Sequence, residues 1–121
     1  MRIARLYNDS AGESHFAEVE IDLTMTDYVA SAPPLRLSAW TAATQFSFMK
    51  APAGWNSEWH VSEARTIFFV LSGEWEVTAS DGESRRFAMG ETLLVEDTSG
   101  KGHASRVTSD VDSLAAMVQL A

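Results

Sequence analysis

The sequence predicts a single all-β domain that forms a sandwich or a barrel, and three observations support this prediction. Short apolar runs recur at intervals of roughly ten residues, which is the spacing typical of strands in such folds. Several runs alternate apolar and polar side chains with a period of two, as half-buried strands do. The chain has 121 residues, which is the size of one domain with one hydrophobic core.

The first expected strand spans residues 16–23, where apolar and acidic side chains alternate. Residues 27–38 contain an Ala-Pro-Pro sequence, and proline removes amide donors and imposes extended geometry. This segment is therefore predicted to be a connector or an edge. It divides the chain into an N-terminal arm with one strand (residues 1–38), which packs on the barrel or on a partner subunit, and a β-barrel (residues 39–121).

Seven further strands are expected in the second part of the chain. They are residues 44–49, 66–71, 74–78, 85–87, 92–95, 103–108 and 114–120. The strand at 66–71 is apolar on both faces, which is typical of a strand covered on both sides. The Asp81-Gly82 pair tolerates the positive φ angles of a tight hairpin between the third and fourth of these strands. For the last segment, helix propensity favours a short helix as the alternative.

The composition excludes several classes of function. The chain has no cysteine, which excludes disulfides, thiolate metal sites and a cysteine nucleophile. Its formal net charge is −8, and Arg85-Arg86 is its only adjacent basic pair, so nucleic acid is not an expected partner. The N-terminus turns polar within a few residues and no window reaches a membrane-spanning length, so a cytoplasmic protein with no membrane partner is expected.

Two histidines lie beside glycine-containing turns next to expected strands. Glu58 and His60 are two residues apart and share a face if this segment is extended. If His103 reaches the same face, one carboxylate and two imidazoles meet there, a donor set suited to non-haem iron, manganese or zinc. The alternative is that each histidine is simply hydrogen-bonded or solvated.

The segments Glu58 to Gly73 and Gly90 to His103 resemble the two sequence motifs of the cupin superfamily. The resemblance covers about residues 40 to 120 and implies a jelly-roll barrel, also called a double-stranded β-helix. It places four side chains at the family's metal-ligand positions, namely Glu58, His60, Thr66 and His103. Two usual ligands are retained, Glu58 is a substitute, and the Thr66 hydroxyl is a poor ligand. The resemblance therefore implies a divalent metal (Fe, Mn, Ni or Zn) held by Glu58, His60 and His103.

The cupin superfamily includes enzymes of many kinds and binding modules, so three functions stay open. The first is a small-molecule enzyme with a pocket inside the barrel and the metal just described. The second is a metal-free isomerase, epimerase or dehydratase in which His60 and His103 are the acid and base. The third is a ligand-binding module without catalysis.

Four residues are candidates for the substrate pocket. Trp55 lies in a loop that can form a rim, and Thr66 occupies a position in the first motif. Arg65 and Lys101 can bind a carboxylate, an enolate or a phosphate, and a surface position is the alternative for each. The acidic pair Glu96-Asp97 follows an expected strand and is interpreted as part of a turn.

A homodimer is expected, because the strand at residues 67–71 has an apolar outer face that a small barrel cannot cover by itself. His15 precedes the first expected strand, and its expected role is a surface or subunit contact. A position in a pocket is the alternative for His15.

Overall fold

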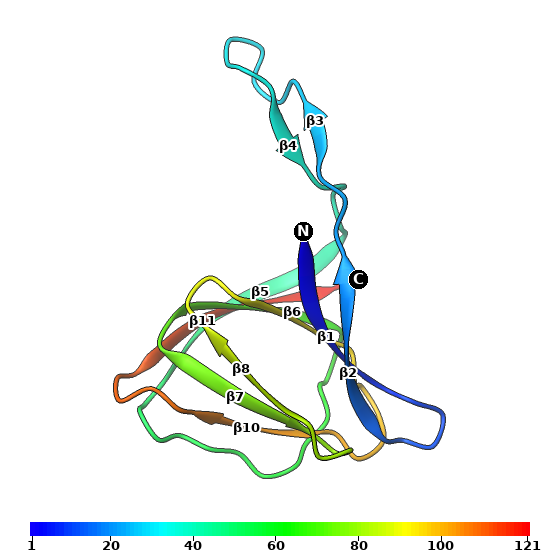
Figure 1. The fold of residues 1–121 in the computed structure, drawn as a ribbon, viewed down its shortest axis with the longest axis vertical. Coiled ribbons are helices and arrows are strands. Elements are labelled where there is room, and N and C mark those ends of the chain that lie inside the picture. The colour runs from blue at the N-terminus through cyan, green and yellow to red at the C-terminus, as the bar shows by residue number, and fades with distance from the viewer.

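The computed structural model describes residues 1–121 and consists of strands without any helix. A six-stranded sheet has the order β2-β1-β9-β6-β11-β5, and a three-stranded sheet has the order β10-β7-β8. The two sheets face each other and form the barrel, and β3 and β4 form a separate hairpin (Figure 1). The strands are β1 (Arg2–Asn8), β2 (Ser14–Glu20), β3 (Thr24–Thr26), β4 (Leu35–Leu37), β5 (Ala43–Ala51), β6 (Thr66–Ser72), β7 (Glu74–Ala79), β8 (Ser84–Ala88), β9 (Thr92–Val95), β10 (His103–Val107) and β11 (Ser113–Leu120). The prediction of an all-β domain is confirmed.

The seven strands expected after residue 39 all form, and their ends differ from the expected ones by a few residues. The Asp81-Gly82 turn joins β7 and β8, with Gly82 at a φ of 98° and the Asp81 side chain accepting the amide of Glu83. The last segment is the strand β11, which pairs with both β5 and β6. Pairing on both sides satisfies its backbone groups, and this outweighs its helix propensity. No helix long and apolar enough to cross a membrane is present.

The N-terminal part differs most from expectation. The alternation pattern predicts one strand in residues 1–38, whereas the structure has four. β1 pairs antiparallel with β2 and parallel with β9, so the first twenty residues extend the six-stranded sheet. Leu6 of β1 is completely buried between the sheets. The parallel partner of β1 lies almost ninety residues away in the sequence, and local periodicity carries no information about such a pairing.

The β3–β4 hairpin stands away from the barrel (Figure 1). Its two strands are hydrogen-bonded only to each other, with Thr24 opposite Leu37 and Thr26 opposite Leu35. The segment between them contains the two prolines that predict a connector. Both ends of the hairpin therefore lead back to the barrel, while the hairpin itself remains outside it.

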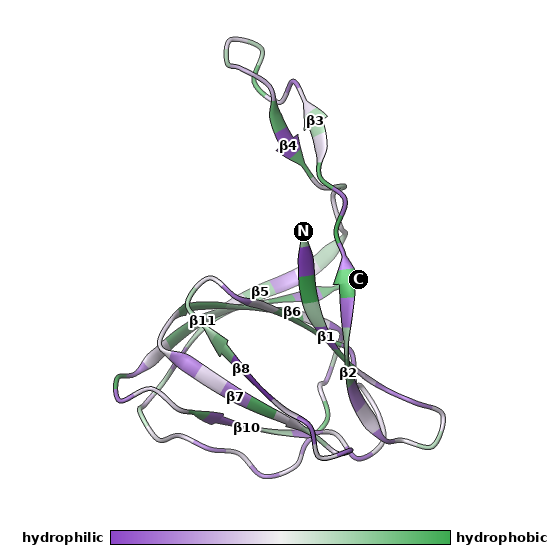
Figure 2. Cartoon of the chain, in the orientation of Figure 1, coloured by the Kyte–Doolittle hydropathy of each residue, from purple (hydrophilic) through white to green (hydrophobic).

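The hydrophobic core lies between the two sheets. It combines residues of both, namely Leu6, Phe16, Ala51, Val70, Trp75, Val77, Ala79, Phe87, Leu93, Val95 and Val107. Trp75 is almost completely buried, and its indole Nε1 donates to the hydroxyl of Ser113 at 2.7 Å. Figure 2 shows the contrast between β6, which is hydrophobic along most of its length, and β7, which alternates.

Candidate functional site

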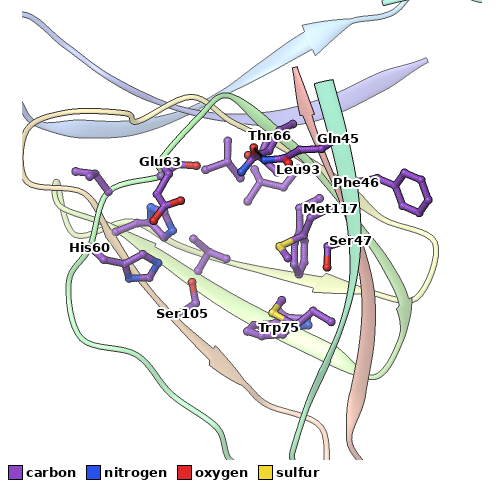
Figure 3. A pocket seen from close by; sticks show the side chains of 18 of the residues that line it. Gln45, Phe46, Ser47, His60, Glu63, Thr66, Trp75, Leu93, Ser105 and Met117 are labelled. Atoms are coloured by element: carbon purple, nitrogen blue, oxygen red, sulfur yellow. Dashed lines mark hydrogen bonds between the residues drawn. The ribbon is translucent and has the colours of Figure 1, made fainter. Parts of the chain in front are cut away.

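A cavity of about 500 Å³ lies between the two sheets (Figure 3). Its wall comes from β5, β6, β9 and β11 of the larger sheet, from β7 and β10 of the smaller one, and from the loop before β6. Its apolar lining includes Met49, Phe68, Trp75, Val77, Leu93, Val95 and Met117, and its polar lining is Gln45, Ser47, His60, Ser62, Glu63, Thr66, His103, Ser105 and Gln119. The volume is in the range of small-molecule sites.

His60 and His103 meet at this cavity although they are far apart in the sequence. The amide of each donates to the carbonyl oxygen of the other at 2.9 Å, which forms a short antiparallel bridge between the loop and the start of β10. Their ring centroids are 4.5 Å apart. His103 is buried, whereas His60 is exposed. One imidazole therefore lies in the interior of the site and the other at its edge.

Gly102 makes this approach of the two histidines possible. Its φ is +74°, and a Cβ at this position would collide with the carbonyl group of His60. A side chain at residue 102 would therefore be both strained and too close to the loop.

Asp97 orients the imidazole of His103. Its Oδ2 lies 2.6 Å from Nδ1 of His103, and its side chain is completely buried. Its Oδ1 has no hydrogen-bond partner. A neutral His103 donates its Nδ1 proton to this carboxylate, which leaves the lone pair of Nε2 free for the cavity. Nε2 makes no hydrogen bond to another protein group.

The role of Asp97 corrects the interpretation of Glu96-Asp97 as a turn. Leu93 and Val95 of β9 are buried, and the two-residue period of a strand places Asp97 on the same inward side. This parity is visible in the sequence and is the signal that could have identified Asp97. Glu96 has the opposite parity and binds Arg5 and Arg65 instead.

The two predicted pocket cations do not line the cavity. Arg65 donates to Glu96 at 2.6 Å, and Lys101 is paired with Glu13. Partial burial of Glu96 raises its pKa, but hydrogen bonds from the two arginines outweigh this effect and hold the pKa below its usual value. The hydrogen bond to Glu13 raises the pKa of Lys101. Arg65 has the opposite strand parity to Thr66, which explains why it turns away from the cavity.

The other candidates divide between the cavity and the surface. Trp55 and Thr66 line the cavity, and the ring of Trp55 lies edge-on to Trp75. His15 lies outside it, between the carboxylates of Asp9 and Asp81 at 2.7 and 2.9 Å.

Several cavity residues have no signal in the sequence motifs. Gln45 and Gln119 face each other across β5 and β11, and the amide of Gln45 donates to the side-chain oxygen of Gln119 at 2.6 Å. Glu63 lies in the loop before β6 and is exposed. It is the only acidic residue of the lining, and no lysine or arginine belongs to the lining.

Comparison with known proteins identifies the fold. No protein-family model and no curated protein matches the chain. A cupin 2 conserved barrel domain protein from Salinispora arenicola is 23% identical, with a TM-score of 0.53 over 72% of this chain and 73% of the other. A predicted oxalate decarboxylase from Thermotoga maritima is 20% identical, with a TM-score of 0.51 over 84% and 95%. A cupin domain from Bordetella pertussis is 14% identical, with a TM-score of 0.50 over 63% and 79%.

The chain has the cupin fold. The predicted jelly-roll architecture is thereby confirmed, and the cavity lies inside the cupin barrel. The motif resemblance also implies a divalent metal, so the donor atoms around the cavity decide whether a metal fits.

The residues present do not fit a metal of the expected kind. Metal sites of catalytic proteins use about three protein ligands, and no group of three or more His, Cys, Asp or Glu side chains here can hold an ion. Glu58 does not line the cavity, and its backbone carbonyl oxygen accepts the Nδ1 proton of His60 at 2.9 Å. The hydroxyl of Thr66 donates to the carbonyl of Ala64. The predicted site of Glu58, His60 and His103 is therefore not assembled.

Proposed function

We propose that this cupin is a small-molecule enzyme that moves protons in its cavity, with His103 as the acid–base group and Asp97 as the residue that positions it. The reaction class is isomerisation, epimerisation or dehydration, without a resident metal. The observation that carries this proposal is the contact between Nδ1 of His103 and the buried Asp97 carboxylate.

This arrangement suits proton transfer for two physical reasons. Imidazole exchanges a proton near neutral pH, so it is both a competent base and a competent acid. The Asp97 carboxylate keeps the Nδ1 proton in place and stabilises the imidazolium that forms when Nε2 accepts a second proton.

The proposed step begins with a carbon acid, such as a C–H group beside a carbonyl. Nε2 of His103 takes the proton, and the electron pair of the broken C–H bond moves into an enolate. In the isomerisation of a hydroxyketone, the same imidazolium returns the proton to the former carbonyl carbon, while the proton of the neighbouring hydroxyl group passes to the enolate oxygen and that hydroxyl carbon becomes the new carbonyl. In a dehydration it protonates the departing hydroxyl group, which leaves as water. In an epimerisation we assign the second proton transfer to His60, whose ring centroid is 4.5 Å from that of His103.

The cavity favours an uncharged, partly apolar substrate. Phe68, Trp55 and Trp75 supply an aromatic wall, while serine and glutamine side chains supply neutral polar contacts. A carboxylate or phosphate would lose its hydration without meeting a cation. For this reason the oxalate named for the Thermotoga maritima neighbour, a dianion at neutral pH, is not proposed as the substrate here.

A hydrogen–deuterium exchange screen tests the proposal while the substrate is still unidentified. Neutral ketones, aldehydes and hydroxyketones are incubated with the protein in D₂O, and loss of their C–H signals is followed by proton NMR. We expect exchange with wild-type protein, the same rate after dialysis against a chelator, and a loss of about a hundredfold or more in His103→Gln. The matched control is His15→Gln, which removes a histidine outside the cavity and should keep the full rate.

Three outcomes would contradict the proposal. If hydrogen–deuterium exchange persists in His103→Gln, His103 is not the acid–base group. Stoichiometric metal in protein purified without a chelator, with exchange lost on its removal, would restore the metal hypothesis. A ligand that binds the cavity and shows neither exchange nor turnover would identify a binding module.

A further inference from the structure

The inner face of the six-stranded sheet carries its side chains in three rows that cross the strands. The pairing register defines these rows, because residues opposite each other on neighbouring strands lie side by side. The first row is Gln45, Gln119, Thr66 and Val95, the second is Ser47, Met117, Phe68 and Leu93, and the third is Met49, Ala115 and Val70. Successive rows are two residues apart along each strand, so the three rows together span about 13 Å.

Polarity decreases from the first row to the third. The first row contains two glutamines and a threonine, the second row contains Ser47, and the third row has no polar side chain. Gln45 and Gln119 form a single hydrogen bond with each other, which leaves one carbonyl oxygen and one amide nitrogen of the pair without a partner in the chain. A free acceptor and a free donor therefore lie at the first-row end of the cavity.

The smaller sheet has the same order of polarity on the opposite wall. His103 is held near the first row, because its partner Asp97 follows Val95 by two residues. Trp75 lies against the second row, with its ring centroid 5.4 Å from that of Phe68. The inward residues of β10 and β7 pair in between, as His103 with Ala79, Ser105 with Val77 and Val107 with Trp75. Both walls are thus polar at the His103 end and apolar at the Trp75 end.

The apolar end of the cavity is also the more deeply buried. Trp75 and Leu93 are each 2% exposed, whereas His60 and Glu63 at the polar end are exposed. Figure 3 shows Gln45 on one side of the cavity and Trp75 on the other. An apolar group gains most from leaving water at the buried end, while a polar group keeps its hydrogen bonds at the exposed end.

We propose that the substrate is a neutral carbonyl compound with an apolar tail, bound with its carbonyl group beside His103 and its tail along the second and third rows. The role of His103 rests on the proposed function, and the inference adds the class of substrate and its direction in the cavity. Met117 in the second row and Met49 in the third both line the cavity, so they contact the tail at increasing depth. Their flexible side chains fill the space that a shorter tail leaves.

The opposite direction of binding is unfavourable at both ends. A carbonyl group at the third row would lose its water without meeting a side-chain donor, because the indole Nε1 of Trp75 is already bonded to Ser113. An apolar tail at the first row would cover the free donor and acceptor of Gln45 and Gln119.

Methyl ketones of increasing length, from 2-pentanone to 2-undecanone, test the proposal. Protein labelled with ¹³C at the methionine methyl groups reports the position of the tail by NMR, because Met49 and Met117 line the cavity while Met25 and Met89 are exposed outside it. We expect the shortest ketones to shift the Met117 signal, longer ones to shift both cavity signals, and none to shift Met25 or Met89. Affinity should rise by about three- to fourfold per methylene group and stop rising once the tail passes Met49.

Met49→Gln gives the matched comparison. It places a polar amide at the third row with little change in size, so it should weaken binding of the longest ketones by about tenfold and leave 2-pentanone unaffected. Met89→Gln makes the same change at an exposed position and should alter neither affinity. His103→Gln should keep the dependence on tail length while losing exchange in D₂O, so the direction of binding is judged separately from the acid–base role of His103.

Three results would overturn the proposal. The first is an affinity that does not depend on tail length. The second is a shift of Met25 or Met89 as large as that of Met49. The third is an equal loss of affinity for 2-pentanone and for the longest ketones in Met49→Gln. If that variant does not fold, the methionine signals of the wild-type protein still decide between the two directions of binding.

Discussion

Nδ1 of His103 and Oδ2 of Asp97 are 2.6 Å apart, and the carboxylate lies behind the imidazole, out of contact with solvent. The five residues between them form the turn that connects β9 to β10. The pair therefore links the end of β9, in the six-stranded sheet, to the start of β10, in the three-stranded sheet. It presents one imidazole nitrogen to a cavity with a largely apolar wall.

Asp97→Asn should preserve this geometry while removing the negative charge. The asparagine carries no charge to stabilise an imidazolium, and its amide NH₂ group can donate to Nδ1 of His103, which imposes the wrong tautomer on the ring. We expect the rate of proton transfer to fall by about a hundredfold or more, with little change in ligand affinity. Exchange kinetics at varied substrate concentration separate these two effects. The control is Asp112→Asn, which changes an exposed carboxylate, and an equal loss in both variants would contradict a specific role for Asp97.

Gly102→Ala should disrupt the bridge between His60 and His103. The new methyl group collides with the backbone of the His60 loop, in addition to the cost of the left-handed conformation. Gly54→Ala is the matched control, since Gly54 has a φ of +80° and no atom within 4 Å of the new methyl group. We expect Gly102→Ala to lower the free energy of unfolding by about 1 to 3 kcal/mol more than Gly54→Ala, measured by urea denaturation. If the two variants lose the same free energy of unfolding, the His60 loop moves aside without destabilising the fold, and the prediction is wrong.

His15 should stabilise the fold in a limited range of pH. Its imidazole joins Asp9 after β1 to Asp81 in the β7–β8 turn, and the hydrogen bond with Asp9, followed by that with Asp81, raises the pKa of His15 above its ordinary value of 6.5. The hydrogen bond to His15 is the largest cause of a lowered pKa for Asp9, and a backbone hydrogen bond from Glu83 is the largest for Asp81.

The sign of the pH dependence follows from these shifts. The raised pKa of His15 means that its contribution to stability is fully present below pH 6.5, the ordinary histidine pKa. This contribution is lost as the pH rises through the pKa of His15 in the folded protein. The lowered aspartate pKa values give stability that is present above 3.8 and is lost as the pH falls. The difference in unfolding free energy between wild type and His15→Gln should therefore be largest between pH 3.8 and 6.5. A difference that does not vary with pH would contradict this role.

The cavity should discriminate against anions. Trp55 and Trp75 line it, so quenching of tryptophan fluorescence reports binding of aromatic probes. We expect 2-naphthol to bind more tightly than 2-naphthoate by roughly tenfold or more, because the carboxylate is desolvated without a cation and meets Glu63. Glu63→Gln should narrow this difference by improving the affinity for 2-naphthoate. Equal affinity of the two probes for the wild-type protein would contradict the inferred preference for neutral ligands.

The barrel strands were predictable because their signal is local. Period-two alternation in residues 74–78 and the Asp81-Gly82 turn depend on side chains within a few positions of each other. β1 was not predictable in the same way, since it is defined by a parallel pairing with β9. Its place in the large sheet depends on a contact between distant segments.

The site was predictable in part. The motif resemblance identified His60 and His103, and the structure brings them together at one cavity. Glu58 and Lys101 lie in loops, where the two-residue period does not determine the direction of a side chain, whereas the outward direction of Arg65 follows from its parity opposite to Thr66. Asp97 follows the buried alternation of β9, so its inward position could be read from parity, whereas its contact with His103 required the turn geometry.

The tautomer of His103 is the most direct test of the central claim, because it requires neither a substrate nor an assay. Long-range ¹H–¹⁵N correlation spectra of the wild-type protein, recorded at a pH where the ring is neutral, identify the protonated nitrogen. We expect the proton on Nδ1 and a bare Nε2, with this preference weakened in Asp97→Leu. A neutral His103 with its proton on Nε2 would contradict the proposed base, since no lone pair would then face the cavity.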